Sequence, residues 1–299
     1  MMMSGAIEYF QFVLAPQMLI GLVVGVAVIL VALGLTIIFG LLDVINMSHG
    51  EFYALGAFIA LALASIGLPF WLLLILVPLV MIPIGYVVER GLIQRVFHTS
   101  ERHVTTLLLT FGLGLVMEDV FRLIWGPNPY RPETPIAGGV DVFGIFVPSY
   151  RLFLIVVGAA IISAVALIIY RTRLGAMVRA AAYDRHMAAS LGVPVRHVYA
   201  GAFAFGVALA GLAGVLLAPI YSVFPTMGRD FILMAFTVVI VGGMGSIAGA
   251  VIAGLFLTQV QAIVSLYISP VWSDPIVFGI MVAMLMVRPQ GLFGRLGHG

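Results

Sequence analysis

Residues 9–42 read YFQFVLAPQMLIGLVVGVAVILVALGLTIIFGLL, thirty-four residues without one charged side chain. Further charge-free runs follow at 52–88, 104–117, 152–170, 197–228, 231–273 and 275–287. A helix needs about 20 apolar residues to cross a bilayer, and the runs are continuously apolar, without the alternation of membrane β-strands. The sequence therefore predicts an all-α polytopic membrane protein. We expect a bundle of about eight to ten transmembrane helices, some broken or half-length, in a single transmembrane domain over 1–299.

The composition excludes several classes of protein. Of the 299 residues, 63% are hydrophobic and 9% are charged, whereas a soluble domain is nearer half apolar and a quarter charged. A water-soluble enzyme and a nucleic-acid-binding protein are thereby excluded, and lipid is the expected surrounding. Because the chain has no cysteine, it can form neither a disulfide nor a thiolate metal site.

Motifs for nucleotide binding and catalysis are missing from the sequence. All fourteen basic residues are arginines, so no lysine is present to hold nucleotide phosphates in a phosphate loop. Neither HExxH nor GxSxG occurs, and no spaced His/Cys cluster is found. We expect no enzymatic activity, no cofactor and no metal. The energy for uphill transport would come from another chain, or from an ion pathway that these sequence patterns do not reveal.

The arginines indicate the orientation, because cytoplasmic loops of membrane proteins are rich in basic residues. Segment 89–103 holds three arginines, segment 171–196 holds five, and Arg288 and Arg295 lie near the end of the sequence. These three regions are expected in the cytoplasm. Loop 126–150 would then lie outside.

The remaining spans follow from this orientation by alternation. Arg229 and Asp230 would occupy an outer loop, and three crossings would follow it. The predicted spans are 104–125, 151–170, 200–221, 231–248, 249–269 and 271–287. Run 9–42 is too long for one straight span, and its Gly34 and Gly40 suggest a full helix followed by a broken half-helix, which leaves the side of the N-terminus open.

A polar segment, Asp43 to Glu51, interrupts two long apolar runs. Ionisable groups at membrane depth are costly and usually face a cavity lined by protein, and broken helices expose backbone groups to solutes in transporters. Candidate residues for a translocation path are therefore Asn46, Ser48, His49 and Glu51. An ordinary cytoplasmic turn built from turn-forming residues is the alternative. A metal site is weakly supported, since His49 and Glu51 have no third ligand.

Segment 171–196 has an alanine-rich centre, which favours a helix, followed by Gly192 and Pro194 as a stop. The segment is too short to span the bilayer and too apolar to lie in water. It would lie either on the membrane surface or in a groove of a cytoplasmic partner. Separately, Glu118 and Arg122 are four residues apart and could pair on one helical face, in a structural role.

Four ordered sequence blocks resemble one known family. The blocks are Ala32–Ala57 with its Asn46-Met-Ser-His-Gly-Glu51 core, Gly175–Val193, Ile240–Ala250 with Gly242-Gly-Met-Gly245, and Arg288–Gly294. Together they resemble branched-chain amino-acid ABC importer permeases of the LivH type. The family often has Phe-Ala before His-Gly, where this chain has Met47-Ser48. Relatives are also assigned to urea, short amides or aromatic acids, so the resemblance does not fix the solute.

The resemblance implies a division of labour among subunits of a bacterial inner-membrane importer. Such permeases pair with a second, related permease of the LivM type, two cytoplasmic ATPase subunits bind the ATP, and an extracytoplasmic binding protein delivers the solute. The residues implied to contact the ATPase are Arg179, Ala180, Ala182, Asp184, Ala189 and Gly192. Segment 49–51 would lie near the translocation path.

Two other functions remain as alternatives. In a stand-alone secondary transporter or channel, segment 171–196 would lie on lipid and this chain alone would carry solute. A membrane-embedded enzyme is the third class, but the sequence contains no catalytic constellation for it.

Overall fold

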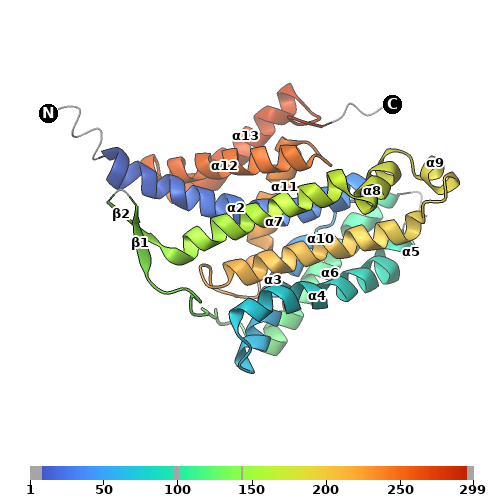
Figure 1. Ribbon diagram of the computed structural model, residues 1–299. Helices are drawn as coiled ribbons and strands as arrows, with labels where there is room; N and C mark the ends of the chain where they lie inside the picture. Colours follow the sequence, from blue (N-terminus) through green and yellow to red (C-terminus); the bar gives the residue numbers. More distant parts are fainter. Residues whose placement is uncertain (1–8, 97–100, 143, 295–299) are drawn as a thin grey trace.

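The computed structural model describes residues 9–96, 101–142 and 144–294, and most of them are helical (Figure 1). Within these described ranges, six helical stretches are long and apolar enough to cross a membrane. In the described part of the chain nine helices have fifteen or more residues: α2 (Ala15–Leu42), α3 (His49–Ser65), α4 (Phe70–Val88), α6 (Arg102–Trp125), α7 (Ser149–Arg171), α10 (Val195–Leu217), α11 (Met227–Gly242), α12 (Ile247–Tyr267) and α13 (Ser273–Val287). The predicted fold class is confirmed.

The shorter elements lie between these helices. A π-turn, η1 (Phe10–Leu14), precedes α2, and a second one, η2 (Glu89–Ile93), leads from α4 into α5 (Gln94–Val96). Two short helices, α8 (Arg173–Tyr183) and α9 (Arg185–Ser190), connect α7 to α10, and a 3-10 turn, η3 (Pro270–Trp272), precedes α13. Strands β1 (Gly139–Val142) and β2 (Ile145–Pro148) pair antiparallel, with Gly139 opposite Pro148. The sequence did not predict this hairpin inside loop 126–150.

The expected break in run 9–42 is wrong. Residues 10–42 form one continuous helical stretch, and Gly34 and Gly40 serve as sites of close packing. A Cβ atom on Gly34 would lie 2.6 Å from the carbonyl oxygen of Gly206, and one on Gly40 would lie 2.8 Å from the Cα of Gly245. Small residues let membrane helices approach closely, so these glycines admit neighbouring backbones and do not end the helix.

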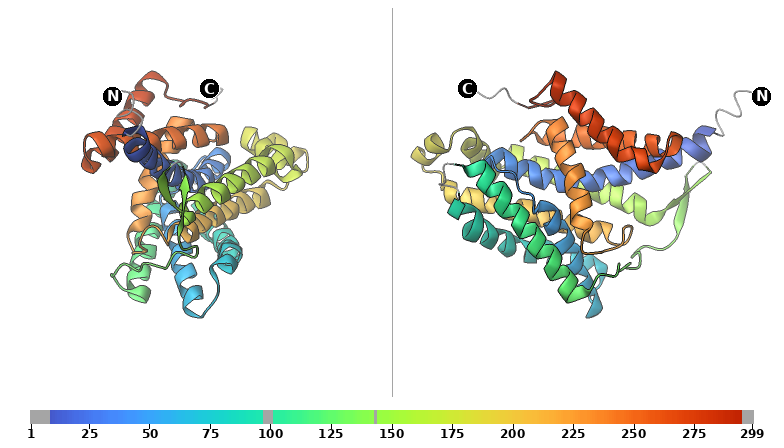
Figure 2. Two further views of the ribbon diagram at one scale, coloured as in Figure 1. Left: turned by 60° about the vertical axis from the view of Figure 1, so that its left-hand side comes forward. Right: turned by 180° about the vertical axis from the view of Figure 1, so that it is seen from behind.

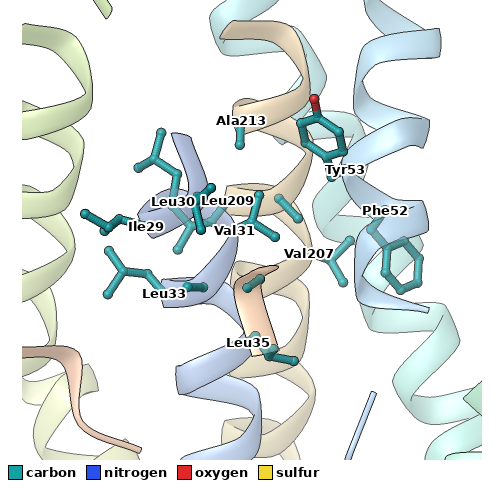
Figure 3. Packing of buried hydrophobic residues seen from close by; sticks show 14 of the residues in the cluster. Ile29, Leu30, Val31, Leu33, Leu35, Phe52, Tyr53, Val207, Leu209 and Ala213 are labelled. Carbon is teal, nitrogen blue, oxygen red and sulfur yellow. The ribbon is translucent and has the colours of Figure 1, made fainter. Parts of the chain in front are cut away.

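The core of the bundle lies around α2 and α10, whose residues are mostly buried. Figure 3 shows the two helices side by side, with Val31 and Leu209 between them, and Tyr53 and Val207 between α10 and α3. All four side chains are buried. A helix apolar on all sides belongs in the middle of a bundle, and this explains why α2 carries no charge.

The two ends of the bundle differ (Figure 1). The β1–β2 hairpin and the start of α2 lie at one end, and α5, α8 and α9 lie at the other. Arg196 of α10 donates to Gln94 of α5 over 3.0 Å. At the end of the described chain, Leu292 N donates to the carbonyl of Val241 at the end of α11. Arg295 lies outside the described residues.

Candidate functional site

The polar segment that follows α2 turns back into the bundle. Asp43 ends α2 in the left-handed region, with φ 52°, and its carboxylate pairs with Arg102 of α6 at 3.1 Å. Further along, Met47 N donates to Thr110 Oγ1 of α6 over 3.0 Å. The His49 ring lies 3.1 Å from the carbonyl oxygen of Val31. Since Val31 lies in the middle of the 10–42 stretch, α3 begins inside the bundle.

All four candidate path residues are brought together at this helix start. Asn46, Ser48 and His49 are fully buried, and Glu51 is 6% exposed. The Ser48 hydroxyl donates to Asn46 Oδ1 over 2.7 Å. Three polar atoms have no hydrogen-bond partner among the described residues: Asn46 Nδ2, His49 Nδ1 and Glu51 Oε2. A cytoplasmic turn would leave such side chains in water, so their burial disfavours that alternative.

A second helix, α11, also begins inside the bundle. After α10 ends at Leu217, the chain pairs with the loop at Tyr130 through Val223 and then returns inward. Gly228, in the first turn of α11, meets Gly50 in the first turn of α3: a Cβ atom on Gly50 would lie 2.1 Å from the Gly228 carbonyl oxygen. Two helix N-termini therefore face each other. Figure 2 (right) shows α11 crossing α2 at a steep angle.

This arrangement corrects the expected position of Arg229 and Asp230. Both were assigned to an outer loop, whereas they lie in the first turn of α11, and Arg229 pairs with Glu118 of α6. The start of α11 was predicted at 231 as the start of a full crossing. Alternation of spans assumes that each apolar run crosses the bilayer completely, and the inward return before α11 breaks that assumption.

Glu118 is the centre of an ion-pair cluster. Its nearly buried carboxylate accepts from Arg122, as the four-residue spacing predicted, and also from Arg229. Arg122 contacts Asp119 as well, at 3.3 Å. Glu51 lies within electrostatic range of Glu118, Arg229 and Asp230. Sequence analysis did not predict the contact to Arg229, because two partners 111 residues apart leave no local spacing pattern.

A separate cavity of about 880 Å³ opens between the ends of α3, α6 and α10 and residues 130–135. Trp125 lines this cavity, and its ring packs against Phe58 and Phe121 with centroids 4.8 and 6.4 Å away. Phe121 lies one helical turn from Glu118 on α6. The three aromatic rings therefore lie between the cavity and the ion-pair cluster.

Segment 171–196 forms two helices where one was expected. Thr172 caps α8 by accepting from Gly175 N, and Asp184 separates the helices and caps α9 by accepting from His186 N and Met187 N. The hydrogen bonds from Met187 and His186 hold the pKa of Asp184 below its usual value. The expected stop is present, since α9 ends at Ser190 and Gly192 has φ 85°.

The α8–α9 segment has one face against the bundle and one face free. Gly175, Ala181 and Ala188 are buried. The small residues of the alanine-rich centre are thus divided between the buried and the exposed side. The exposed side carries large apolar side chains and small residues: Leu174, Ala180, Ala182, Tyr183, Met187, Ala189, Leu191 and Gly192. Arg179 is also exposed, while its guanidinium donates to the Ile169 carbonyl of α7.

Comparison with known proteins identifies the family. A protein-family model, described as the permease component of branched-chain amino-acid transport systems, matches residues 17–285. The chain belongs to this family. It is a multi-pass membrane permease and not an enzyme, and permeases of this ABC type work with ATPase and binding-protein partners.

Curated relatives match over nearly the whole chain. The permease protein LivH of Salmonella typhimurium is 31% identical over 96% of this chain and 97% of its own length. BraD of Pseudomonas aeruginosa, also named as a branched-chain amino-acid permease protein, is 31% identical over 93% of this chain and 95% of its own. LivM of Escherichia coli is 27% identical over 88% of this chain and 67% of its own. No solved structure matches this chain significantly.

Proposed function

We propose that this chain is a single-domain permease subunit of an ATP-driven importer for branched-chain amino acids or a related small polar solute. Separate ATPase subunits bind the ATP, and the bundle alternates between outward and inward access. The observation that carries the proposal is the burial of polar segment 46–51 where α3 and α11 begin face to face. A ligand drives such a switch only through different affinities for the two states.

Asn46, Ser48, His49 and Glu51 are the proposed residues of the translocation path. Half-helices that begin near the middle of a membrane protein direct their N-termini at solutes in many transporters. The polar atoms without partners on Asn46, His49 and Glu51 support this role, because buried polar groups are normally hydrogen-bonded.

The α8–α9 segment is the proposed contact with the ATPases, through Arg179, Ala180, Ala182, Asp184, Ala189 and Gly192. All of these except Asp184 are exposed. Leu174, Tyr183, Met187 and Leu191 add large apolar side chains to the same segment, each more than 60% exposed. Exposed large apolar side chains concentrated in one short segment are typical of a protein interface. Two ATPases would serve two permease subunits.

In the proposed orientation, α8 and α9 lie in the cytoplasm of a bacterium, with the bundle in the inner membrane. The arginines of α5, α8, α9 and the start of α10 support this assignment, because basic residues concentrate on the cytoplasmic side. The β1–β2 hairpin and the 880 Å³ cavity then face outward, toward the binding protein.

A second permease of the LivM type is the proposed neighbour on the α6–α11 face. Arg229 and Arg122 on this face have side chains 57% and 47% exposed, and Asp119 is more exposed still. Charged groups held within membrane helices are costly in contact with lipid. Packing against a related permease, with a wet path between the two chains, would remove that cost, and lipid would cover the apolar faces of α4 and α7.

The experiment tests whether α8–α9 couples the permease to the ATPases. In the variant Ala180→Glu/Ala189→Arg, we expect the ATPases to be lost on co-purification, and ATP-dependent uptake into proteoliposomes to fall to background. The matched control Ala180→Ser/Ala189→Ser keeps both side chains small and should retain both properties. Membrane insertion should be the same in both variants.

Two results would contradict the proposal. One is unchanged co-purification and uptake in the charged variant. The other is solute accumulation by this chain alone, without ATP, which would instead identify a stand-alone transporter or channel.

A further inference from the structure

Glu51 is a buried carboxylate that has a free acceptor atom. Its side chain lies beside the start of α11, where Oε2 would be 2.7 Å from a Cβ atom on Gly228. The residue is 6% exposed, and Oε2 has no hydrogen-bond donor among the described residues. A buried carboxylate without a donor is costly, so this position calls for a group that donates hydrogen bonds.

Two helix starts place partial positive charge near the Glu51 carboxyl group. Glu51 lies in the first turn of α3, and its side chain reaches the first turn of α11 at Gly228. Helix N-termini carry partial positive charge and stabilise nearby anions. Since Gly228 has no side chain, the carboxylate can approach this second helix start closely.

The ionisable groups near Glu51 include more acids than bases. Among the described residues of the cluster, acids are Glu51, Glu118, Asp119 and Asp230, and bases are Arg122 and Arg229. Both arginines are bonded to Glu118. In a site shielded from water, an excess of negative charge attracts a positive group strongly.

We propose that Glu51 binds the α-ammonium group of the solute during its passage through the permease. This inference rests on the proposed function and assigns a recognition role to one residue of that path. An ammonium group supplies both the positive charge and the hydrogen-bond donors that Oε2 lacks. The permease would thereby select amino acids over solutes of similar shape without an amino group, in addition to any selection by the binding protein.

The test uses the assembled complex of the permeases and ATPases in lipid nanodiscs, and it compares three probes of similar size. L-Leucine has both charged groups, 3-methylbutylamine has only the ammonium, and 4-methylpentanoate has only the carboxylate. We expect leucine and the amine to raise the Tm of the wild-type complex, and 4-methylpentanoate to leave it unchanged. In Glu51→Gln, the shifts with leucine and with the amine should both be lost.

Glu89→Gln is the matched control. Glu89 is also a buried carboxylate with an unpartnered Oε2 among the described residues, but it lies in η2 beside Gln94. This variant should keep the wild-type shifts with leucine and the amine. Equal shifts in Glu51→Gln and the wild type, or equal protection by 4-methylpentanoate and the amine, would overturn the inference.

Uptake separates this inference from the proposed function. With ATP and the binding protein, the wild-type complex should import leucine. The uptake rate of Glu51→Gln should be at least about tenfold lower, as expected for a lost hydrogen bond to a charged group. The ATPase activity of the Glu51→Gln complex should persist. No wild-type uptake would contradict the proposed function. Equal uptake by both would overturn this inference alone.

A basic side chain of the second permease is the other source of the same chemistry. Loss of that subunit from the purified Glu51→Gln complex would show that Glu51 pairs with the neighbouring chain, and would overturn the assignment to the solute. Retention of all subunits, together with loss of the leucine shift, supports it.

Discussion

Gly50 of α3 and Gly228 of α11 touch through their backbones where both helices begin. A Cβ atom on Gly228 would lie 2.6 Å from the Gly50 carbonyl oxygen, and one on Gly50 would lie 2.1 Å from the Gly228 carbonyl oxygen. Side chains cannot approach a backbone this closely without movement of the helices. The contact therefore fixes the distance between the two half-helices at the proposed path.

Gly228→Ala should destabilise the permease by about 1–3 kcal/mol, because the added methyl group overpacks a contact between two backbones. Leucine uptake should also fall, since the methyl would lie 2.7 Å from Glu51 Oε2. The measurement is the unfolding temperature of the purified complex, together with uptake. Gly112→Ala is the control, because a Cβ atom there meets no described atom within 4 Å; a similar loss in both variants would contradict the prediction.

The pair between Glu118 and Arg229 should couple α6 to α11. Glu118→Gln and Arg229→Gln should each reduce stability, and the double variant should lose less than the sum, with a coupling energy of about 1 kcal/mol. A double-mutant cycle of unfolding free energies measures this. Asp119→Asn is the control, since Asp119 is largely exposed and contacts only Arg122 among the described ion pairs, and its effect should be small. Additive effects at Glu118 and Arg229 would count against coupling.

Acidification should loosen α9. The pKa of Asp184 is lowered by hydrogen bonds from Met187 N and His186 N, so its ionised form favours the folded cap. That stabilisation is complete above the usual aspartate pKa and is lost as the pH falls through the lowered value. Protection factors from hydrogen exchange at His186 and Met187 should fall with acid in the wild type. They should be independent of pH in Asp184→Asn, whose amide also caps helices; equal pH dependence in both would refute the role of Asp184.

Phe121 should be needed to separate the 880 Å³ cavity from the ion-pair cluster. Phe121→Ala removes a buried ring that packs on Phe58 at 4.9 Å, and should cost about 3 kcal/mol of stability. Proteoliposomes that hold the variant should also leak preloaded leucine. Leu123→Ala on the same helix removes a side chain that is 84% exposed and should do neither. A Phe121→Ala complex that is as stable as the Leu123→Ala control and leaks no more leucine would contradict this role of Phe121.

Local sequence patterns predicted most of the helices. The charge-free runs predicted the fold class. The predicted spans 231–248, 249–269 and 271–287 correspond to α11, α12 and α13, with boundaries that differ by a few residues. The i,i+4 spacing predicted the pair of Glu118 and Arg122. These features depend on neighbouring residues, which the sequence shows directly.

Local sequence patterns did not predict the contacts between segments that are distant in the sequence. Gly34 and Gly40 read as helix breakers, but Gly206 and Gly245 pack against them. Arg229 read as an outer-loop residue because nothing near it in sequence indicates Glu118. The inward turns before α3 and α11 are stabilised by other helices, through Thr110, Val31 and Gly50, and charge counting cannot find them.

The most direct test of the central claim is whether segment 46–51 lines the route of the solute. The chain has no cysteine, so Ser48→Cys introduces a single thiol for labelling with a small charged reagent in the assembled importer. The account predicts that labelling depends on the nucleotide state of the ATPases and that leucine slows it, while Ala213→Cys, fully buried in α10, stays unlabelled. The account would be contradicted if the thiol at position 48 stayed unlabelled in every nucleotide state, like the thiol at position 213.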